Sequence, residues 1–430
     1  MKKGKQSVKT ILIVGTLDTK EDEVLFCRDR IKEKGYDVLL MDAGILGDPK
    51  VAPDIPRSQV AKAGGADDLK TLVATGDKGY CVETMIHGAA IEAARLYEIG
   101  AFQGILGVGG AQGTAICSSA MRALPTGVPK LIVSTVASGR ATFGPFVGTK
   151  DLALMHSVAD IQGLNFFTKR ILTNATGAIC GMVEAFEREI PRPRERTIAL
   201  SMLGTTTRGA LRAKGILEDH GFEVVAFHQN GTGGIAMEDL IREKSFRGVM
   251  DLNLHEIGDR WYGGLHGAIR PDRLEAAGIM GIPQVVAPGS INYVVLGPLD
   301  ELPAEVRTRK LIVHNPTLTL VRLTPEELRE VGRVTAKKLN LSIGPAQVFI
   351  PLRGFCDPDR EGFPLWDPEG NQAFVESLEE TIRPDIPVVK LDAHINDPDF
   401  IDSVVGEFIT IMDKTGGAYG NGGGKNEEAP

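Results

Sequence analysis

Residues Gly104–Thr114 read Gly-Ile-Leu-Gly-Val-Gly-Gly-Ala-Gln-Gly-Thr, and the rest of the chain is best interpreted from this stretch. Its apolar start, Ile105–Val108, predicts a short buried strand, and Ala115–Met121, after the glycines, predicts a helix. A glycine turn between a strand and a helix aims backbone N–H groups and the positive end of the helix dipole at one point. The turn therefore suits a phosphate or a carboxylate; the alternative is that its glycines serve only packing.

The spacing of these glycines does not by itself identify a ligand. The turn is not a Walker A loop, because no Gly-Lys-Ser/Thr follows it. Gln112 stands where a dinucleotide-binding motif would have its third glycine. The interpretation therefore depends on the turns that follow the neighbouring strands.

The first of these turns is Gly15–Lys20, which follows a predicted strand at Thr10–Val14. In a parallel sheet the turn lies at the carboxyl edge, where ligands bind. There Lys20 could neutralise a phosphate, and Asp18 could hold a ribose or a hydrated Mg²⁺. The alternative is that Thr19 and Asp22, three positions later, form a helix capping box.

Another small polar turn, Ser134–Arg140, follows the predicted strand Val128–Val133. Carboxyl ends of parallel strands meet at one edge of a sheet, so we expect the three turns to surround a common ligand.

The second half of the chain repeats the landmarks of the first. A proline-containing charged run at Glu189–Arg196 marks a break between domains. Beyond it a strand at Thr197–Met202 and a glycine turn recur, and three further landmarks follow in the same order as in the first half. We therefore predict an α/β protein with two Rossmann-like subdomains, each with a parallel sheet, related by an internal duplication. The expected boundaries are 1–190 and 197–414, with a disordered tail at 415–430.

Several polar residues of the second half follow predicted strands and are candidates for acid–base chemistry. A metal site is not expected at His255, Asp259 and His266, because their spacing matches no recognised motif; a polar substrate contact or an ordinary hydrogen-bonded histidine is favoured. Cys356 could be a nucleophile, but a buried inert thiol is the favoured interpretation. The catalytic candidates are His255, His314, Arg353, Asp357 and His394.

The composition limits the function further. The formal net charge of −8 in 430 residues provides no general attraction to nucleic acid. The five cysteines are scattered without a Cys-x-x-Cys pair, which favours reduced thiols. No run approaches the roughly 18 consecutive apolar residues of a membrane span. We expect a cytoplasmic protein with neither membrane nor nucleic-acid partners.

Together the turns resemble those of a known family. The similar stretches are Gly15–Lys20, Gly107–Thr114, Ser134–Gly139, His314–Pro316 and His394–Pro398. On these motifs the sequence resembles a largely uncharacterised bacterial family that includes the ATP-binding N-terminal domain of the plant tomato mosaic virus resistance protein. The resemblance implies ATP, with or without Mg²⁺, bound mainly by the first Rossmann-like subdomain, and it implies a homodimer. The implied nucleotide-site residues are Thr16, Asp18, Lys20, Gly109, Gly110, Gly113, Thr114, Ser134, Thr135, Ser138 and Gly139.

The expected function is nucleotide binding at the strand ends of the first subdomain, facing the cleft between the domains. One alternative is an enzyme that uses ATP to activate a small carboxylate or sugar acid. Another is a non-catalytic sensor in which the nucleotide controls a dimer or a partner interface.

Overall fold

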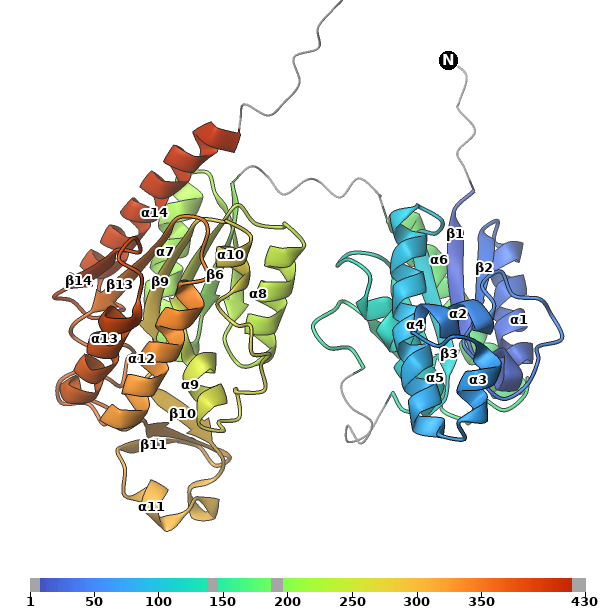
Figure 1. Ribbon diagram of the computed structural model, residues 1–430, viewed down its shortest axis with the longest axis horizontal. Coiled ribbons are helices and arrows are strands. Elements are labelled where there is room, and N and C mark those ends of the chain that lie inside the picture. Colours follow the sequence, from blue (N-terminus) through green and yellow to red (C-terminus); the bar gives the residue numbers. More distant parts are fainter. Residues whose placement is uncertain (1–7, 138–145, 187–195, 420–430) are drawn as a thin grey trace, which may run out of the picture. The chain divides into compact units, whose positions relative to one another are not determined.

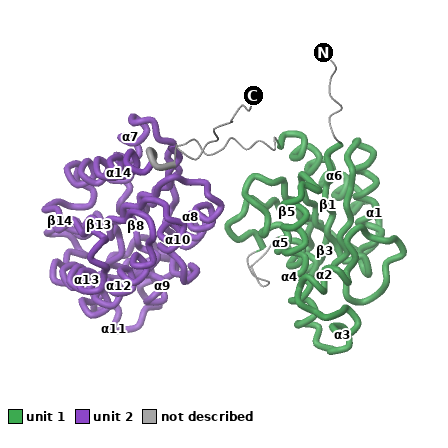
Figure 2. Tube along the Cα trace, turned by 45° about the horizontal axis from the view of Figure 1, so that its top comes forward, with its two compact units in different colours: residues 1–190 green, residues 191–430 purple. Residues whose placement is uncertain are grey.

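The computed structural model describes residues 8–137, 146–186 and 196–419, with side chains described as far as residue 415 (Figure 1). The chain divides into two compact units, Met1–Ile190 and Pro191–Pro430 (Figure 2). Each unit has its own sheet and its own hydrophobic core. Among the described residues, no helix combines the length and the apolar character needed to span a bilayer.

Unit 1 is a parallel sheet with helices on both faces. Its strand order is β2-β1-β3-β4-β5. The apolar residues of β1 alternate between two cores, since Ile11 and Ile13 face one side while Leu12 and Val14 face the other. Helices α1 and α6 cover the first side, and α2, α3, α4 and α5 cover the second. The strands are β1 (Thr10–Gly15), β2 (Asp37–Asp42), β3 (Gly104–Gly109), β4 (Lys130–Ser134) and β5 (Ala153–His156). The helices are α1 (Leu17–Glu33), α2 (Arg57–Ala63), α3 (Leu69–Ala74), α4 (Lys78–Glu98), α5 (Ala111–Arg122) and α6 (Phe166–Ala185).

Unit 2 is built around a parallel sheet of order β14-β13-β9-β8-β6-β7. Helices α7 and α14 pack on one face, and α8, α10, α12 and α13 pack on the other (Figure 1). The strands are β6 (Thr197–Met202), β7 (Glu223–His228), β8 (Gly248–Asn253), β9 (Gln284–Gly289), β13 (Ala346–Pro351) and β14 (Val388–Leu391). The helices are α7 (Thr207–Asp219), α8 (Thr232–Arg242), α9 (His255–Trp261), α10 (Ala276–Ile279), α12 (Pro325–Leu339), α13 (Pro368–Thr381) and α14 (Pro398–Tyr419).

The first five strands of the two parallel sheets have the same order, and the sheet of unit 2 has β14 as a sixth strand. In each unit the second strand lies beside the first, and the third, fourth and fifth follow on the first strand's other side. Gly35 and Gly221, which precede the second strand of each unit, both have a positive φ, of 86° and 81°. The predicted α/β fold with two Rossmann-like parallel sheets is confirmed, and the shared order is the one that an internal duplication requires.

Two features differ from the sequence prediction. The sequence predicts a strand at Lys310–Val313 with His314 after its end, but β11 (Leu311–Asn315) includes His314 and lies outside the parallel sheet. It pairs antiparallel with β12 (Leu318–Arg322), and β12 pairs with β10 (Tyr293–Leu296). This small sheet lies near the short helices η2 (Leu299–Glu301) and α11 (Ala304–Arg307) (Figure 1).

Helix α14 continues to Tyr419, so the first five residues of the predicted disordered tail, 415–419, are helical. The hydroxyl of Thr415 donates to the carbonyls of Ile411 and Met412, so the helical geometry persists beyond the predicted end.

Candidate functional site

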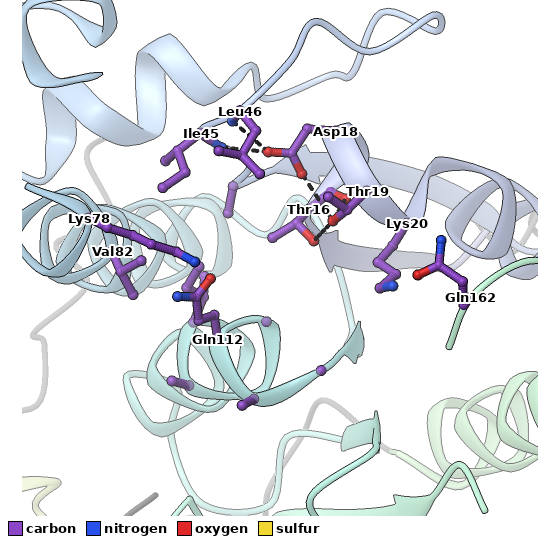
Figure 3. A pocket seen from close by; sticks show the side chains of 16 residues that line it. Thr16, Asp18, Thr19, Lys20, Ile45, Leu46, Lys78, Val82, Gln112 and Gln162 are labelled. Carbon is purple, nitrogen blue, oxygen red and sulfur yellow. Dashed lines mark hydrogen bonds between the residues drawn. The ribbon is translucent and has the colours of Figure 1, made fainter. Parts of the chain in front are cut away.

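A cavity of about 960 Å³ opens at the carboxyl edge of the first sheet (Figure 3). It is lined by the turn after β1, by the turn after β3 and by the start of α4. The chain runs from β1 to β2, which lies on one side of β1, whereas β3 lies on the other side. The order of the strands therefore reverses between β1 and β3. In open parallel sheets this reversal leaves a crevice, which is the usual ligand site.

The N-termini of two helices, α1 and α5, lie at the cavity. Helix α1 begins after Thr16, and its first amide, that of Leu17, donates to Oδ1 of Asp42 at 3.0 Å. No side chain in the described part of the protein caps α5, which begins after Gly110. By contrast, Asp68, Asp77 and Asn165 cap α3, α4 and α6. The first amides of a helix have no partner within the helix, so α5 offers these groups to a ligand, whereas the Asp42 carboxylate already accepts from the first amide of α1.

The glycines of the turn after β3 serve two purposes. A Cβ on Gly109 would lie 2.6 Å from Cα of Gly113, so Gly109 is required for packing. A Cβ on Gly110 would meet only the Thr135 hydroxyl, at 3.8 Å, and one on Gly113 would meet only a backbone oxygen of Val108, at 3.7 Å. Packing alone therefore accounts for Gly109 but not for Gly110 and Gly113, which line the cavity.

The backbone conformation of Gly110 does not require glycine either. Its φ is −76°, within the range of ordinary residues, so the positive φ that this turn could have adopted is absent at this position. The main effect of a glycine at position 110 is that no side chain fills this part of the cavity.

Two lysines line the cavity. Lys20 has a non-helical backbone (φ −130°, ψ 23°) that kinks α1, and its ammonium group donates to the carbonyl of Ile161. Lys78, the first residue of α4, was not predicted; its side chain points toward Gln112 (Figure 3). The prolines and glycines that precede Lys78 in the sequence do not predict a helix, and only Asp77, a typical helix cap, indicates that a helix starts there.

Asp18 lines the cavity but is engaged by the protein. One of its oxygens accepts hydrogen bonds from the amides of Ile45 and Leu46, at 2.8 and 2.7 Å, and the other accepts from the Thr19 hydroxyl at 3.2 Å. Asp18 therefore fixes one wall of the cavity. Because the Thr19 hydroxyl contacts Asp18 and Thr16, and α1 begins after Thr16, the alternative capping box at Thr19 does not start this helix.

Three other predicted nucleotide-site residues pack beside the glycine turn that follows β3. Thr114 and Ser134 are fully buried, with their hydroxyls 2.7 Å apart. Thr135 is half-buried and close to Gly110. The predicted residues that line the cavity are Thr16, Asp18, Lys20, Gly110 and Gly113, whereas Ser138 and Gly139 lie outside the described residues.

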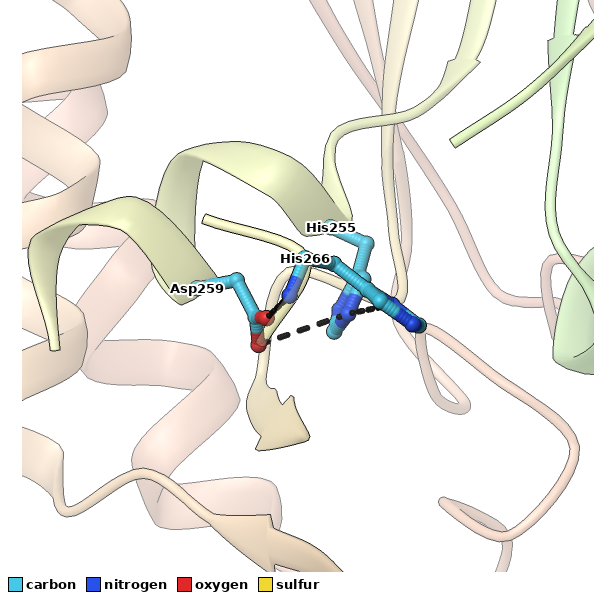
Figure 4. Close-up of side chains that lie close together, drawn as sticks. All are labelled: His255, Asp259 and His266. Atoms are coloured by element: carbon cyan, nitrogen blue, oxygen red, sulfur yellow. Dashed lines mark hydrogen bonds and ion pairs between the residues drawn. The ribbon is translucent and has the colours of Figure 1, made fainter. Parts of the chain in front are cut away.

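In unit 2 three side chains converge at the corresponding edge of the sheet (Figure 4). Nε2 of His255 lies 3.2 Å from Nδ1 of His266 and 3.4 Å from Oδ1 of Asp259. His255 and Asp259 are completely buried, and His266 is half-buried. Burial lowers the pKa of His255 to about 4 and raises the pKa of Asp259 to about 6. Burial, followed by repulsion from His255, also lowers the pKa of His266. The sequence spacing gave no motif for this cluster, because a loop returns His266 to α9.

The remaining catalytic candidates lie in different surroundings. Asp357 accepts from Arg208 and from Asn396, whose amide also donates to the carbonyl of Thr205. His394 is buried and donates from Nε2 to the carbonyl of Cys356. These contacts bring Asp357 and His394 to one region of the sheet edge.

His314 and Arg353 are separate from that region. His314 is exposed on β11, and Arg353 forms an exposed bidentate ion pair with Asp392 at 2.7 and 2.8 Å. Cys356 is completely buried, and burial raises the pKa of its thiol well above the ordinary value, in agreement with an inert thiol.

Comparison with known sequences gives matches over nearly the whole chain. The sequence model described as "Uncharacterised protein family (UPF0261) N-terminal domain" matches residues 9–188, and that of the C-terminal domain matches residues 195–412. A UPF0261 protein of Clostridium tetani is 42% identical over 407 residues, which cover 94% of this chain and 100% of the relative. The ToMV resistance protein Tm-1(GCR237) of Solanum lycopersicum is 36% identical over 318 residues, which cover 73% of this chain and 42% of that protein.

Among solved structures, the UDP-N-acetylglucosamine 2-epimerase from Rickettsia bellii aligns with 97% of this chain and 99% of its own. The identity is 10% and the TM-score is 0.23, so this likeness carries no argument about function.

Proposed function

We propose that this chain, which belongs to the UPF0261 family, binds ATP at the carboxyl edge of its first sheet. The observation that carries the proposal is that the uncapped N-terminus of α5 and two lysines line one cavity where the strand order reverses. Helix amides and ammonium groups both favour an anion, and a triphosphate has enough charge and length to reach both. The motif resemblance points to ATP among the nucleoside triphosphates.

The lining suggests an orientation for the nucleotide. The amides at the start of α5 and the ammonium group of Lys20 would hold the phosphates, with Mg²⁺ accompanying them. Ile45, Val82 and Ile116 give the cavity an apolar part for the base. The volume of about 960 Å³ is at the upper end of the roughly 300–1,000 Å³ typical of small-molecule sites.

Isothermal titration calorimetry with ATP and AMP, both with Mg²⁺, tests the proposal. Lys20→Ala should weaken ATP binding by roughly 10–100-fold, the equivalent of one charge-assisted contact, and should weaken AMP binding less. Lys32→Ala, which removes an exposed lysine at the far end of α1, is the charge-matched control and should bind both ligands as the unmodified chain does. Failure of the unmodified chain to bind ATP would contradict the proposal.

The same preparations distinguish the two uses of a bound nucleotide. Phosphate release in the presence of candidate carboxylates or sugar acids would identify an ATP-using enzyme. Saturable binding without turnover, with a change in oligomeric state measured by light scattering, would identify a nucleotide sensor acting through a homodimer.

A further inference from the structure

The three-residue cluster of His255, Asp259 and His266 occupies the position in unit 2 that the glycine turn occupies in unit 1. Gly104 and Gly248 both pair with the second residue of the first strand in their unit. In both units the next helix begins the same number of residues after this glycine. The first helical residue is Ala111 in unit 1 and His255 in unit 2. Unit 2 therefore places an imidazole where unit 1 presents only backbone groups.

Hydrogen bonding fixes the proton of His255. Its Nδ1 lies 3.1 Å from the carbonyl oxygen of Ser290. A carbonyl oxygen can only accept, so Nδ1 carries the proton and Nε2 presents a lone pair. Ser290 holds that carbonyl from a left-handed backbone conformation, with a φ of 57°, which is uncommon for a residue with a side chain.

The lone pair of His255 faces another acceptor. Oδ1 of Asp259, 3.4 Å away, accepts from the amide of Val295 at 2.7 Å, and Oδ2 accepts from the amide of His266 at 2.6 Å. Two amide donors hold the carboxylate in its orientation without neutralising it. Two facing acceptors require a positive centre near them, either a proton from His266 or a cation.

We propose that His255, Asp259 and His266 bind a divalent first-row transition-metal ion, through Nε2, Oδ1 and Nδ1 respectively. The ligand atoms of a tetrahedral Zn²⁺, each about 2.0–2.2 Å from the metal, lie roughly 3.3–3.6 Å apart. The observed distances from Nε2 of His255, 3.2 Å to His266 and 3.4 Å to Asp259, agree with this geometry. Two imidazoles and one carboxylate suit Zn²⁺ and its neighbours rather than Mg²⁺ or Ca²⁺, which prefer oxygen ligands.

The surroundings of the cluster resemble those of functional metal sites. A ligating histidine normally donates its other N–H to a carbonyl, as His255 does to Ser290. A Cβ on Gly264 would lie 2.2 Å from Cγ of Asp259, so a glycine is required for the loop to pass over the carboxylate. Three protein ligands leave the fourth coordination position open to water or substrate. Because His266 is only half-buried, this position would be reached from solvent on the side of His266.

Metal titration of the full-length chain tests this inference. After chelator treatment and dialysis, the chain should bind one Zn²⁺ per molecule in calorimetry, and Co²⁺ should give the visible absorption of a site with nitrogen ligands. His266→Ala should weaken Zn²⁺ binding by at least about 100-fold, because loss of a ligand exceeds the roughly 10–100-fold effect of losing an outer-shell partner. This variant keeps the backbone amide that holds Asp259, and its melting curve checks its folding.

His220→Ala is the matched control, since it removes an exposed histidine at the end of α7 and should leave Zn²⁺ binding unchanged. Lys20→Ala should also leave it unchanged, which separates this inference from the nucleotide proposal. The inference is overturned if the chain binds no stoichiometric Zn²⁺, or if His266→Ala binds it as tightly. In either case the His266 proton alone satisfies His255.

Discussion

The hydroxyl groups of Thr114 and Ser134 lie 2.7 Å apart, and both side chains are completely inaccessible to solvent. Thr114 belongs to the first turn of α5, and Ser134 ends β4. The Ser134 hydroxyl also accepts from the amide of Val136 at 3.1 Å. This pair therefore joins the helix that begins at the glycine turn to the neighbouring strand, and it fixes the position of the amides at the cavity.

We expect Ser134→Ala to lower the free energy of unfolding by about 1–3 kcal/mol, because it deprives the buried Thr114 hydroxyl and the Val136 amide of a partner. Chemical denaturation measures the change. Thr173→Val, which removes an exposed hydroxyl from α6, should change stability by less than about 0.5 kcal/mol. A stability loss that is equal in both variants would contradict the structural role of Ser134.

Gly110→Val should abolish ATP binding while the protein remains folded, because its Cβ has room and its side chain would project into the cavity. We expect a stability change below about 1 kcal/mol. Denaturation curves and ATP titrations on the same preparation measure both effects. A folded Gly110→Val that binds ATP with unchanged affinity would falsify the assignment of the phosphates to this turn.

Gly109→Ala, unlike Gly110→Val, should lower the stability of the fold. Its Cβ would lie 2.6 Å from Cα of Gly113, so the fold should lose about 1–3 kcal/mol through overpacking. Comparison of the Gly109 and Gly110 variants by thermal melts separates packing from ligand contact. Equal destabilisation by both variants would contradict the difference in packing between Gly109 and Gly110.

Millimolar ATP with Mg²⁺ should raise the melting temperature. A ligand that binds only the folded state stabilises it by about 2.7 kcal/mol at 100 times its Kd. Differential scanning fluorimetry gives the shift, and Lys20→Ala should reduce it. AMP at the same concentration is the control, and an unchanged melting curve with ATP would argue strongly against the nucleotide site.

His394 should make unit 2 sensitive to acid. Burial, together with repulsion from Arg360, lowers the pKa of His394, and Nδ1 already accepts from Arg360 at 2.8 Å and from the amide of Asn396 at 3.1 Å. The unfolded state therefore binds the proton more readily, and stability should fall as the pH drops below the ordinary histidine value of about 6.5.

Urea denaturation at about pH 7 and about pH 5 measures this effect. His394→Gln, which cannot titrate, should lose part of the pH dependence, whereas His220→Ala, at an exposed position, should keep it. An identical pH dependence in His394→Gln would mean that other groups cause the acid sensitivity.

The sequence identified the parts of the fold that depend on local patterns. The apolar strand Ile105–Val108 and the turn after it are correctly predicted, because a buried parallel strand and a glycine turn each depend on residues that are adjacent in the sequence. The small antiparallel sheet was missed, since β11 has the same short apolar pattern as a parallel strand and only its partner β12 determines its direction.

The site was predicted less completely than the fold. Lys78 reaches the cavity from a helix that is far from the glycine turn in the sequence, and no local pattern reports that proximity. Asp18 was correctly expected at the edge, but its bonds to Ile45 and Leu46 depend on a loop whose path the sequence does not specify. The convergence of His255 and His266 likewise depends on a returning loop.

The common strand order of the two units has an evolutionary consequence. If the two units arose by the predicted duplication, each inherited one crevice at the reversal of its chain order, and only one of the two crevices has to keep the original role. The helix after the third strand now begins with alanine in one copy and histidine in the other. We therefore expect the residues around Ala111 and those around His255 to vary independently among homologues.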